Sequence, residues 1–150
     1  MMSDPQPPGW LKPMNKVMMA LGKLGVVTGP VRVLTVVGRK TGQPRSTPAT
    51  PFTLQGAVYV AGGYQKADWV LNARAAGEGI VTKGRSSERV SFVELSADEA
   101  RPVLRAFPRE VPAGVGFYKR AGLVGDGTPE EFEALAGRCA VFRLDPIPAG

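Results

Sequence analysis

The pattern of apolar and polar positions predicts a short amphipathic helix over residues 14–24. Apolar side chains recur there with i, i+3, i+4 and i+7 spacing, and the lysines lie off that stripe. Residues 1–13 contain four prolines and are expected to form a loose arm. Crossing a bilayer takes roughly 20 apolar residues. The helix is therefore expected to pack on the core or to bind a membrane surface as a basic amphipathic helix.

Short apolar runs separated by glycine and proline predict six strands. They cover residues 31–37, 46–54, 57–61, 80–83, 88–95 and 139–144. Gln55 and Gly56 form a two-residue connection typical of a hairpin. Pro48 and Pro51 have no N–H group for a strand ladder, so the strand that contains them is expected at a sheet edge or a bulge.

Helices are predicted between and after these strands. They cover residues 67–76, 96–107, 114–123 and 128–136. Ser96 and Glu99 have the spacing of a capping box, and Pro108 is expected to end the helix that they open. The order of elements predicts one α+β domain over residues 14–150, in which antiparallel strands close into a small barrel with helices on its outside.

Composition narrows the chemistry. Histidine is absent, which excludes Ser-His-Asp and Cys-His catalysis and any zinc site with imidazole ligands, and no metal is expected. Cys139 is the single cysteine, so no internal disulfide forms, and the lack of a signal pattern predicts a cytoplasmic protein, with membrane association through residues 14–24 as the alternative. An enzyme of this composition is expected to take its chemistry from a cofactor.

The charge favours anionic partners. The formal net charge is +6 and the sequence pI is about 9.8. Aromatic residues make up 7% of the chain and do not interleave with the basic ones, which argues against a nucleic-acid partner. Phosphorylated or carboxylated cofactors and anionic lipid surfaces remain.

A basic turn at residues 38–45 is the densest functional signal. Arg39, Lys40 and Arg45 lie within seven residues of one another, and two glycines let the backbone turn tightly. Guanidinium groups bind phosphate or carboxylate oxygens in a forked geometry, and the Thr41 hydroxyl adds a further donor. The turn therefore predicts an anion site, with an ordinary solvated hairpin turn as the alternative.

A second group of candidate residues follows the strand at 57–61. Gly62 and Gly63 permit a ligand to approach the backbone closely. Trp69 and Asn72 are three residues apart on one predicted helix and share a face, which suits a flat heteroaromatic ring. Burial of Trp69 in the core is the alternative.

Three segments together carry a resemblance to a known family. TVVGRKTGQPRSTPATPF, AVYVAGG and DWVLNARA, in this order and spacing, resemble the deazaflavin-dependent nitroreductase group of the split-barrel flavin-reductase superfamily. The resemblance implies a six-stranded antiparallel split β-barrel of the FMN-binding type with peripheral helices. It also implies a cationic groove that binds the deazaflavin coenzyme F420.

The same resemblance implies roles for individual residues. The residues expected to grip the phosphate and oligoglutamate tail of F420 are Arg39, Lys40, Thr41 and Arg45. Those expected at the deazaflavin ring are Ala61, Gly62, Gly63, Trp69 and Asn72, and Pro48 and Thr50 are expected to line the groove. The loop at residues 64–67 is shorter than in the family, and Ala67 replaces the family's proline.

The expected activity is hydride transfer from reduced F420 to a hydrophobic acceptor. The acceptor classes are quinones, enones, unsaturated fatty acyl groups and nitroaromatic compounds. Tyr118 is the candidate proton donor, with water as the alternative. Methionines on the helix at 14–24 offer a soft surface for lipidic or quinone tails. The alternatives are an FMN-dependent reductase of the same fold and a non-catalytic carrier of fatty acid or deazaflavin.

Overall fold

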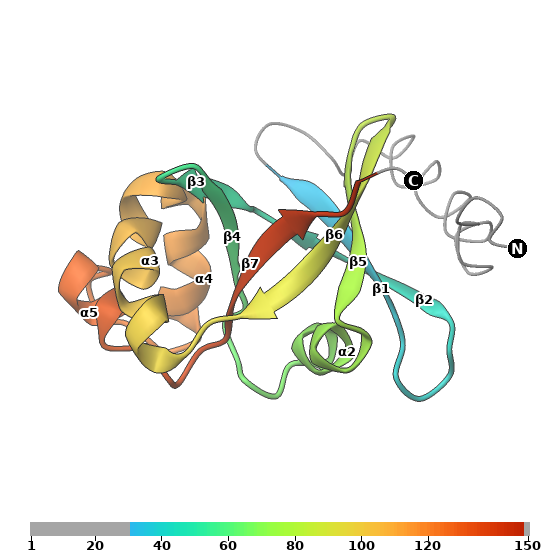
Figure 1. Ribbon diagram of the computed structural model, residues 1–150. Helices are drawn as coiled ribbons and strands as arrows, with labels where there is room; N and C mark the ends of the chain where they lie inside the picture. Colours follow the sequence, from blue (N-terminus) through green and yellow to red (C-terminus); the bar gives the residue numbers. More distant parts are fainter. Residues whose placement is uncertain (1–30, 149–150) are drawn as a thin grey trace, which may run out of the picture.

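A computed structural model describes residues 31–148 of the chain (Figure 1). The predicted arm at residues 1–13 and the predicted helix at 14–24 lie outside the described residues, so both remain predictions. Within the described part, no helix is long and apolar enough to cross a membrane.

Seven antiparallel strands form one sheet. They are β1 (Arg32–Val37), β2 (Pro44–Ala49), β3 (Phe52–Leu54), β4 (Ala57–Ala61), β5 (Glu78–Lys83), β6 (Ser86–Glu94) and β7 (Val141–Pro146). Their spatial order is β2-β1-β5-β6-β7-β4-β3. Strands β2 and β3 thus occupy opposite edges of the sheet, yet only Thr50 and Pro51 separate them in the chain. The sheet must therefore curl until its two edges approach each other, as Figure 1 shows.

The predicted strand at residues 46–54 is wrong as a single element. It divides into β2 and β3 at Thr50 and Pro51, which gives seven strands where the sequence indicated six. Pro48 lies on the edge strand β2 and pairs with Val33 of β1. A missing N–H group is tolerated on an edge strand. The predicted hairpin between β3 and β4 is confirmed, since Gln55 and Gly56 both have positive φ, at 52° and 82°, as a tight hairpin turn requires.

The helices lie in two groups (Figure 1). Helix α2 (Asp68–Ala76) lies below the sheet, close to β1, while α3 (Ala97–Glu110), α4 (Val115–Arg120) and α5 (Pro129–Glu133) gather next to β3 and β4. A short 3-10 turn, η1 (Pro112–Gly114), joins α3 to α4. The helix predicted at 128–136 is shorter than expected, and a short helix does form within 114–123.

Helix α3 confirms one prediction and corrects another. The Ser96 hydroxyl accepts a hydrogen bond from the Glu99 N–H at 3.2 Å, and the Glu99 carboxylate accepts from the Ser96 N–H at 2.8 Å, so the capping box is present. Pro108 does not end the helix, which continues to Glu110. Proline removes one backbone hydrogen bond, but the next turn still closes because the Val111 N–H donates to the Phe107 carbonyl at 2.7 Å and both side chains are buried.

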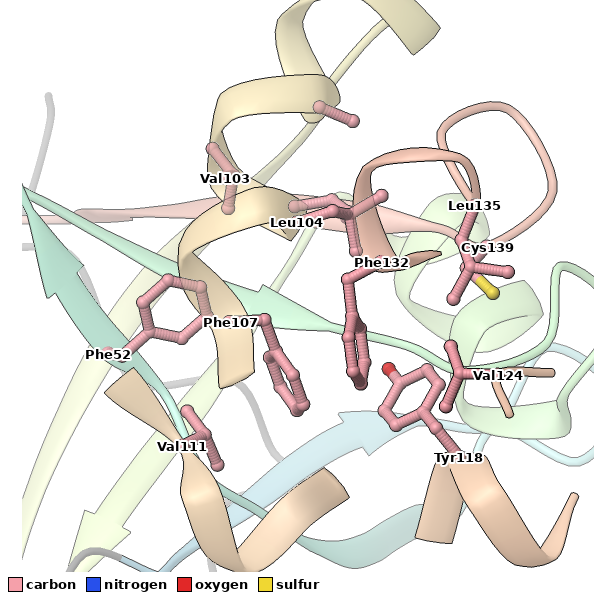
Figure 2. Close-up of a cluster of buried hydrophobic side chains, with 12 residues drawn as sticks. Phe52, Val103, Leu104, Phe107, Val111, Tyr118, Val124, Phe132, Leu135 and Cys139 are labelled. Carbon is pink, nitrogen blue, oxygen red and sulfur yellow. The ribbon is translucent and has the colours of Figure 1, made fainter. Parts of the chain in front are cut away.

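Two hydrophobic clusters stabilise these layers. The first lies under α3, α4 and α5 and is rich in aromatic rings, among them Phe107, Tyr118 and Phe132 (Figure 2). The second lies between α2 and one face of the sheet, where Phe142 and Leu144 alternate with half-buried residues along β7. The candidate site lies where these two clusters meet.

Candidate functional site

The basic turn joins β1 to β2 and is closed by its own backbone. The Gly38 N–H donates to the Gln43 carbonyl at 2.7 Å, and the Gly42 N–H donates to the Gly38 carbonyl at 2.9 Å. Gly42 has φ of +73°, which favours glycine at this position. The Thr41 hydroxyl accepts from the Gln43 N–H at 3.2 Å, so this side chain also shapes the turn that carries it.

Asn72 fixes the orientation of Arg39. Its side chain lies on α2, is 6% exposed, and its Oδ1 accepts from the Arg39 N–H at 3.1 Å and from the Arg39 guanidinium at 2.8 Å. Asp68, one turn earlier on the same helix, lies 3.4 Å from the guanidinium. Helix α2 therefore holds both the backbone and the side chain of the first cation in the turn.

The turn and the helix face each other across a cleft of about 560 Å³. The predicted site residues that line this basic cleft are Arg39, Lys40, Thr41, Arg45, Trp69 and Asn72. Among the described residues that line it, three are cationic and Asp68 is the single carboxylate. The chemistry of this donor set suits an elongated anion.

A second cavity, the apolar chamber, has a volume of about 360 Å³. The predicted site residues that line it are Pro48, Thr50, Ala61, Gly62, Gly63, Trp69 and Tyr118. Its described lining contains no Asp, Glu, Lys or Arg side chain. The chamber therefore favours an uncharged, apolar occupant.

The two cavities adjoin, because Thr47 and Trp69 line both of them. The curled sheet and α2 thus bring all the predicted site residues to the walls of these two adjoining cavities, which together are called the groove. Trp69 also packs against Phe142, with ring centroids 5.8 Å apart, so it has the predicted place in the groove and a share in the core as well.

The glycines after β4 are needed for close packing inside the protein. A Cβ atom on Gly62 would lie 2.9 Å from Val70 Cγ2 and 3.3 Å from Trp69 Cζ2. Gly63 has φ of +77°, and a Cβ atom there would lie 3.1 Å from the Phe117 ring. The backbone at this end of the groove is therefore in direct contact with side chains that form its walls.

Tyr118 is buried in the wall of the apolar chamber. It is 3% exposed, and its ring centroid lies 5.1 Å from those of Phe107 and Phe132 (Figure 2). Burial raises the pKa of its hydroxyl well above the ordinary value, and a hydrogen bond with the backbone of Gly63 offsets this only in part. The phenol is therefore protonated at neutral pH and is a weak acid.

Two aromatic side chains of the chamber, Phe107 and Phe117, had no predicted place in the site, and Tyr64, which follows the predicted Gly62 and Gly63, had no predicted role. Phe107 comes from α3 and Phe117 from α4. Both rings line the chamber, and the Phe117 ring lies beside Gly63, which follows β4. The apolar face of the helix at 96–107 indicated burial of Phe107. Nothing in its spacing indicated which strand it would face.

The short loop at residues 64–67 is held in place by α2 and β6. The Arg74 guanidinium donates to Gln65 Oε1 at 2.8 Å and to both carboxylate oxygens of Glu94, at 2.8 and 2.7 Å. The hydrogen bond with Glu94 raises the pKa of Arg74 above its ordinary value. Tyr64 thus belongs to a loop that is hydrogen-bonded to α2 through Gln65.

The curled antiparallel sheet, with a basic cleft beside an uncharged chamber, has the architecture of a split-barrel protein. The family described as F420H(2)-dependent quinone reductase matches residues 14–122. The chain belongs to this family, whose members use reduced F420. The predicted resemblance to F420-dependent reductases is thereby confirmed, and so is the prediction that the protein is an enzyme.

Solved structures of low sequence identity share the fold. One, described as a domain-swapped dimer, has a TM-score of 0.56 at 19% identity, over 93% of this chain and 100% of that one. The structure of an F420-H2 dependent reductase, FDR-A, has a TM-score of 0.53 at 20% identity, and the match covers 77% of this chain and 94% of that one. The Agrobacterium tumefaciens protein Atu2129, of unknown function, has a TM-score of 0.55 at 13% identity, and the match covers 97% of this chain and 58% of that one. The predicted α+β split-barrel fold is confirmed. No curated protein matches the sequence.

Proposed function

We propose that the protein transfers a hydride from reduced F420 to an uncharged hydrophobic acceptor, with a quinone as the first choice. The observation that carries this proposal is the junction of the basic cleft with the apolar chamber at Trp69 and Thr47. One groove thus offers an anion site and an apolar site side by side. A two-substrate hydride transfer needs both sites, with the reacting atoms in contact.

The residues of the basic cleft fit F420. Its phosphate and oligoglutamate tail is a chain of negative charges, and the cleft supplies Arg39, Lys40 and Arg45 with the Thr41 hydroxyl beside them. The flat ring would lie toward Trp69, which lines both the cleft and the chamber. When bound, reduced F420 supplies a hydride and thereby the two electrons of the reaction.

The chain's own residues would bind and orient the cofactor and the acceptor. Asn72 keeps Arg39 directed into the cleft through two hydrogen bonds, of 3.1 and 2.8 Å. The residues that would form the floor and rim at the ring end are Pro48, Thr50, Ala61, Gly62 and Gly63. The apolar walls replace water around the acceptor, so the reacting atoms meet in a dry site.

The proton that completes quinone reduction comes from water in this proposal. Tyr118 lines the chamber, but burial raises the pKa of its hydroxyl, which weakens it as an acid. Hydride transfer leaves a hydroquinone monoanion, and a proton moving to it from a phenol less acidic than the hydroquinone would go uphill, whereas hydronium and buffer acids of the solvent protonate the monoanion readily. We assign Tyr118 to the wall of the chamber.

The chamber favours some acceptor classes over others. Its described lining carries no cation for a carboxylate, so a fatty acid would have to leave its head group outside. Neutral quinones, enones and nitroaromatic rings meet no such cost. The family's name supports the quinone.

Anaerobic mixing of reduced F420 with the protein and menadione tests the proposal. The expected result is recovery of oxidised F420 absorbance in a one-to-one ratio with menadiol, at a rate well above the protein-free rate. Reduced FMN in the same assay is the competing arm, because FMN also carries a phosphate that the basic turn would accept. A faster reaction with FMN, or no acceleration with either, would contradict the proposal.

A further inference from the structure

We infer that Tyr64 and Phe117 form an aromatic gate that selects a flat, uncharged ring as the acceptor. The inference rests on the proposed function, because it places the acceptor in the apolar chamber. It goes further by naming the two side chains that discriminate one acceptor shape from another.

The gate consists of exposed aromatic surface at the edge of the chamber. Tyr64 and Phe117 are each 47% exposed, and they are the exposed large hydrophobic residues within the described part of the chain. Both line the chamber. Their ring centroids lie 6.4 Å apart with the planes at 76°, an edge-to-face arrangement. Apolar rings left in water beside an apolar cavity mark a ligand contact.

The Phe117 ring and the loop that carries Tyr64 both have contacts with the protein outside the gate. Phe117 packs edge-to-face on Tyr118 with centroids 5.5 Å apart, and its Cε1 lies so close to Gly63 that a Cβ atom there would be 3.1 Å away. The loop that carries Tyr64 is tied down because Arg74 donates to Gln65 at 2.8 Å. These contacts restrict the Phe117 ring and the loop that carries Tyr64 before a ligand arrives, which lowers the entropy cost of binding.

The surface of the gate distinguishes a ring from a chain. Rings that meet edge-to-face present both a face and an edge to a third ring, and aromatic contacts of this kind add to the free energy of simple burial. A flexible acyl chain gains burial but no ring contact, and it loses rotational freedom on binding. With no ionised side chain in the described lining, the chamber adds nothing for a charged head group.

Binding to the cofactor-free protein tests the gate without reference to turnover. The probes are menadione, a flat two-ring quinone, and 1-decanol, an uncharged chain, and the readout is their dissociation constant from calorimetry. Tyr64→Ala and Phe117→Ala should each weaken menadione binding about tenfold and decanol binding less than threefold. Phe117→Leu keeps apolar volume without a flat ring and should show the same selective loss. Lys119→Ala, on the same helix but outside the chamber lining, is the matched control.

The variants that bind weakly should also show a raised KM for menadione with kcat little changed, since the gate acts in binding. Equal losses for menadione and decanol, or no loss in any gate variant, would overturn the inference. Failure of the proposed function alone would give a different result. The parent protein would then bind menadione and the gate variants would bind it more weakly, but reduced F420 would stay unoxidised.

Discussion

At Asn72, one carboxamide oxygen holds both the backbone and the guanidinium of Arg39. The two residues are far apart in the sequence, and the contact joins α2 to the turn between β1 and β2. The side chain predicted to face the cofactor ring thus holds the basic turn, which is proposed to bind the cofactor's anionic tail. Asn72 is a positioning residue in this account.

A double-mutant cycle tests that role. Asn72→Ala frees the Arg39 guanidinium, and a hydrogen bond to a charged group is worth roughly 1.5–3 kcal/mol, so F420 binding should weaken about tenfold. In the Arg39→Ala background the same substitution should cost clearly less, because its target has gone. Fully additive losses would show that Asn72 contacts the cofactor on its own. The measurement is F420 fluorescence titration of the four proteins.

The sequence indicated that Asn72 and Trp69 share a helix face, and they do line the same cleft. It carried no information on the partner of Asn72, because that contact depends on how α2 docks on the sheet. Tyr118 shows the same limit. Its identity suggested a proton donor, whereas its burial, which raises the pKa, comes from helices that pack together only in the folded chain.

One carboxylate at the start of helix α5 binds the backbone of the loop that precedes the helix. Glu131 accepts from the N–H groups of Gly125 at 2.7 Å and Gly127 at 2.8 Å, and those of Asp126 and Thr128 add to them. These hydrogen bonds lower the pKa of Glu131 to about 2. A Cβ atom on Gly127 would lie 2.6 Å from Val115 of α4, so the loop packs directly against the helix that carries Phe117.

Glu131→Gln should therefore lower the melting temperature at pH 7, because the new NH₂ group would face a backbone donor. A carboxylate with a lowered pKa stabilises the fold above its unfolded pKa, near 4.3, and loses that effect as the pH falls toward 2. The difference between parent and variant should then narrow below pH 4.5. Glu88→Gln, exposed on β6, is the charge-matched control. A gap that stays constant from pH 7 to pH 3 in scanning calorimetry would contradict this role.

Element boundaries were predictable where local chemistry decides them. The capping box at Ser96 and the hairpin at Gln55 and Gly56 confirmed their predictions because each depends on neighbours in the chain. The break at Pro51 and the continuation of α3 past Pro108 were not predictable. Both depend on tertiary packing, the first on the curl of the sheet and the second on the buried side chains around the last turn of α3.

Across the whole molecule, the curl of the sheet assembles the groove. The basic turn, the segment after β4 and the face of α2 were each visible in the sequence, and the fold brings them together. The third wall comes from α3 and α4, through Phe107 and Phe117. Those helices follow the recognisable motifs in the chain, so the sequence indicated the residues of the basic turn and of the segment after β4, and did not indicate that Phe107 and Phe117 would line the chamber.

The affinity for F420 as a function of salt concentration tests most directly whether the basic cleft binds the anionic tail of the cofactor. The proteins to compare are the parent, Arg45→Ala and Arg85→Ala. Arg85 lies in the turn between β5 and β6, at the other end of the paired strands β1 and β5, and carries the same charge. Arg45→Ala should weaken binding about tenfold or more and reduce the salt dependence, while Arg85→Ala should match the parent. Equal affinity for all three proteins at low salt would contradict the assignment of the basic cleft to the cofactor's anionic tail.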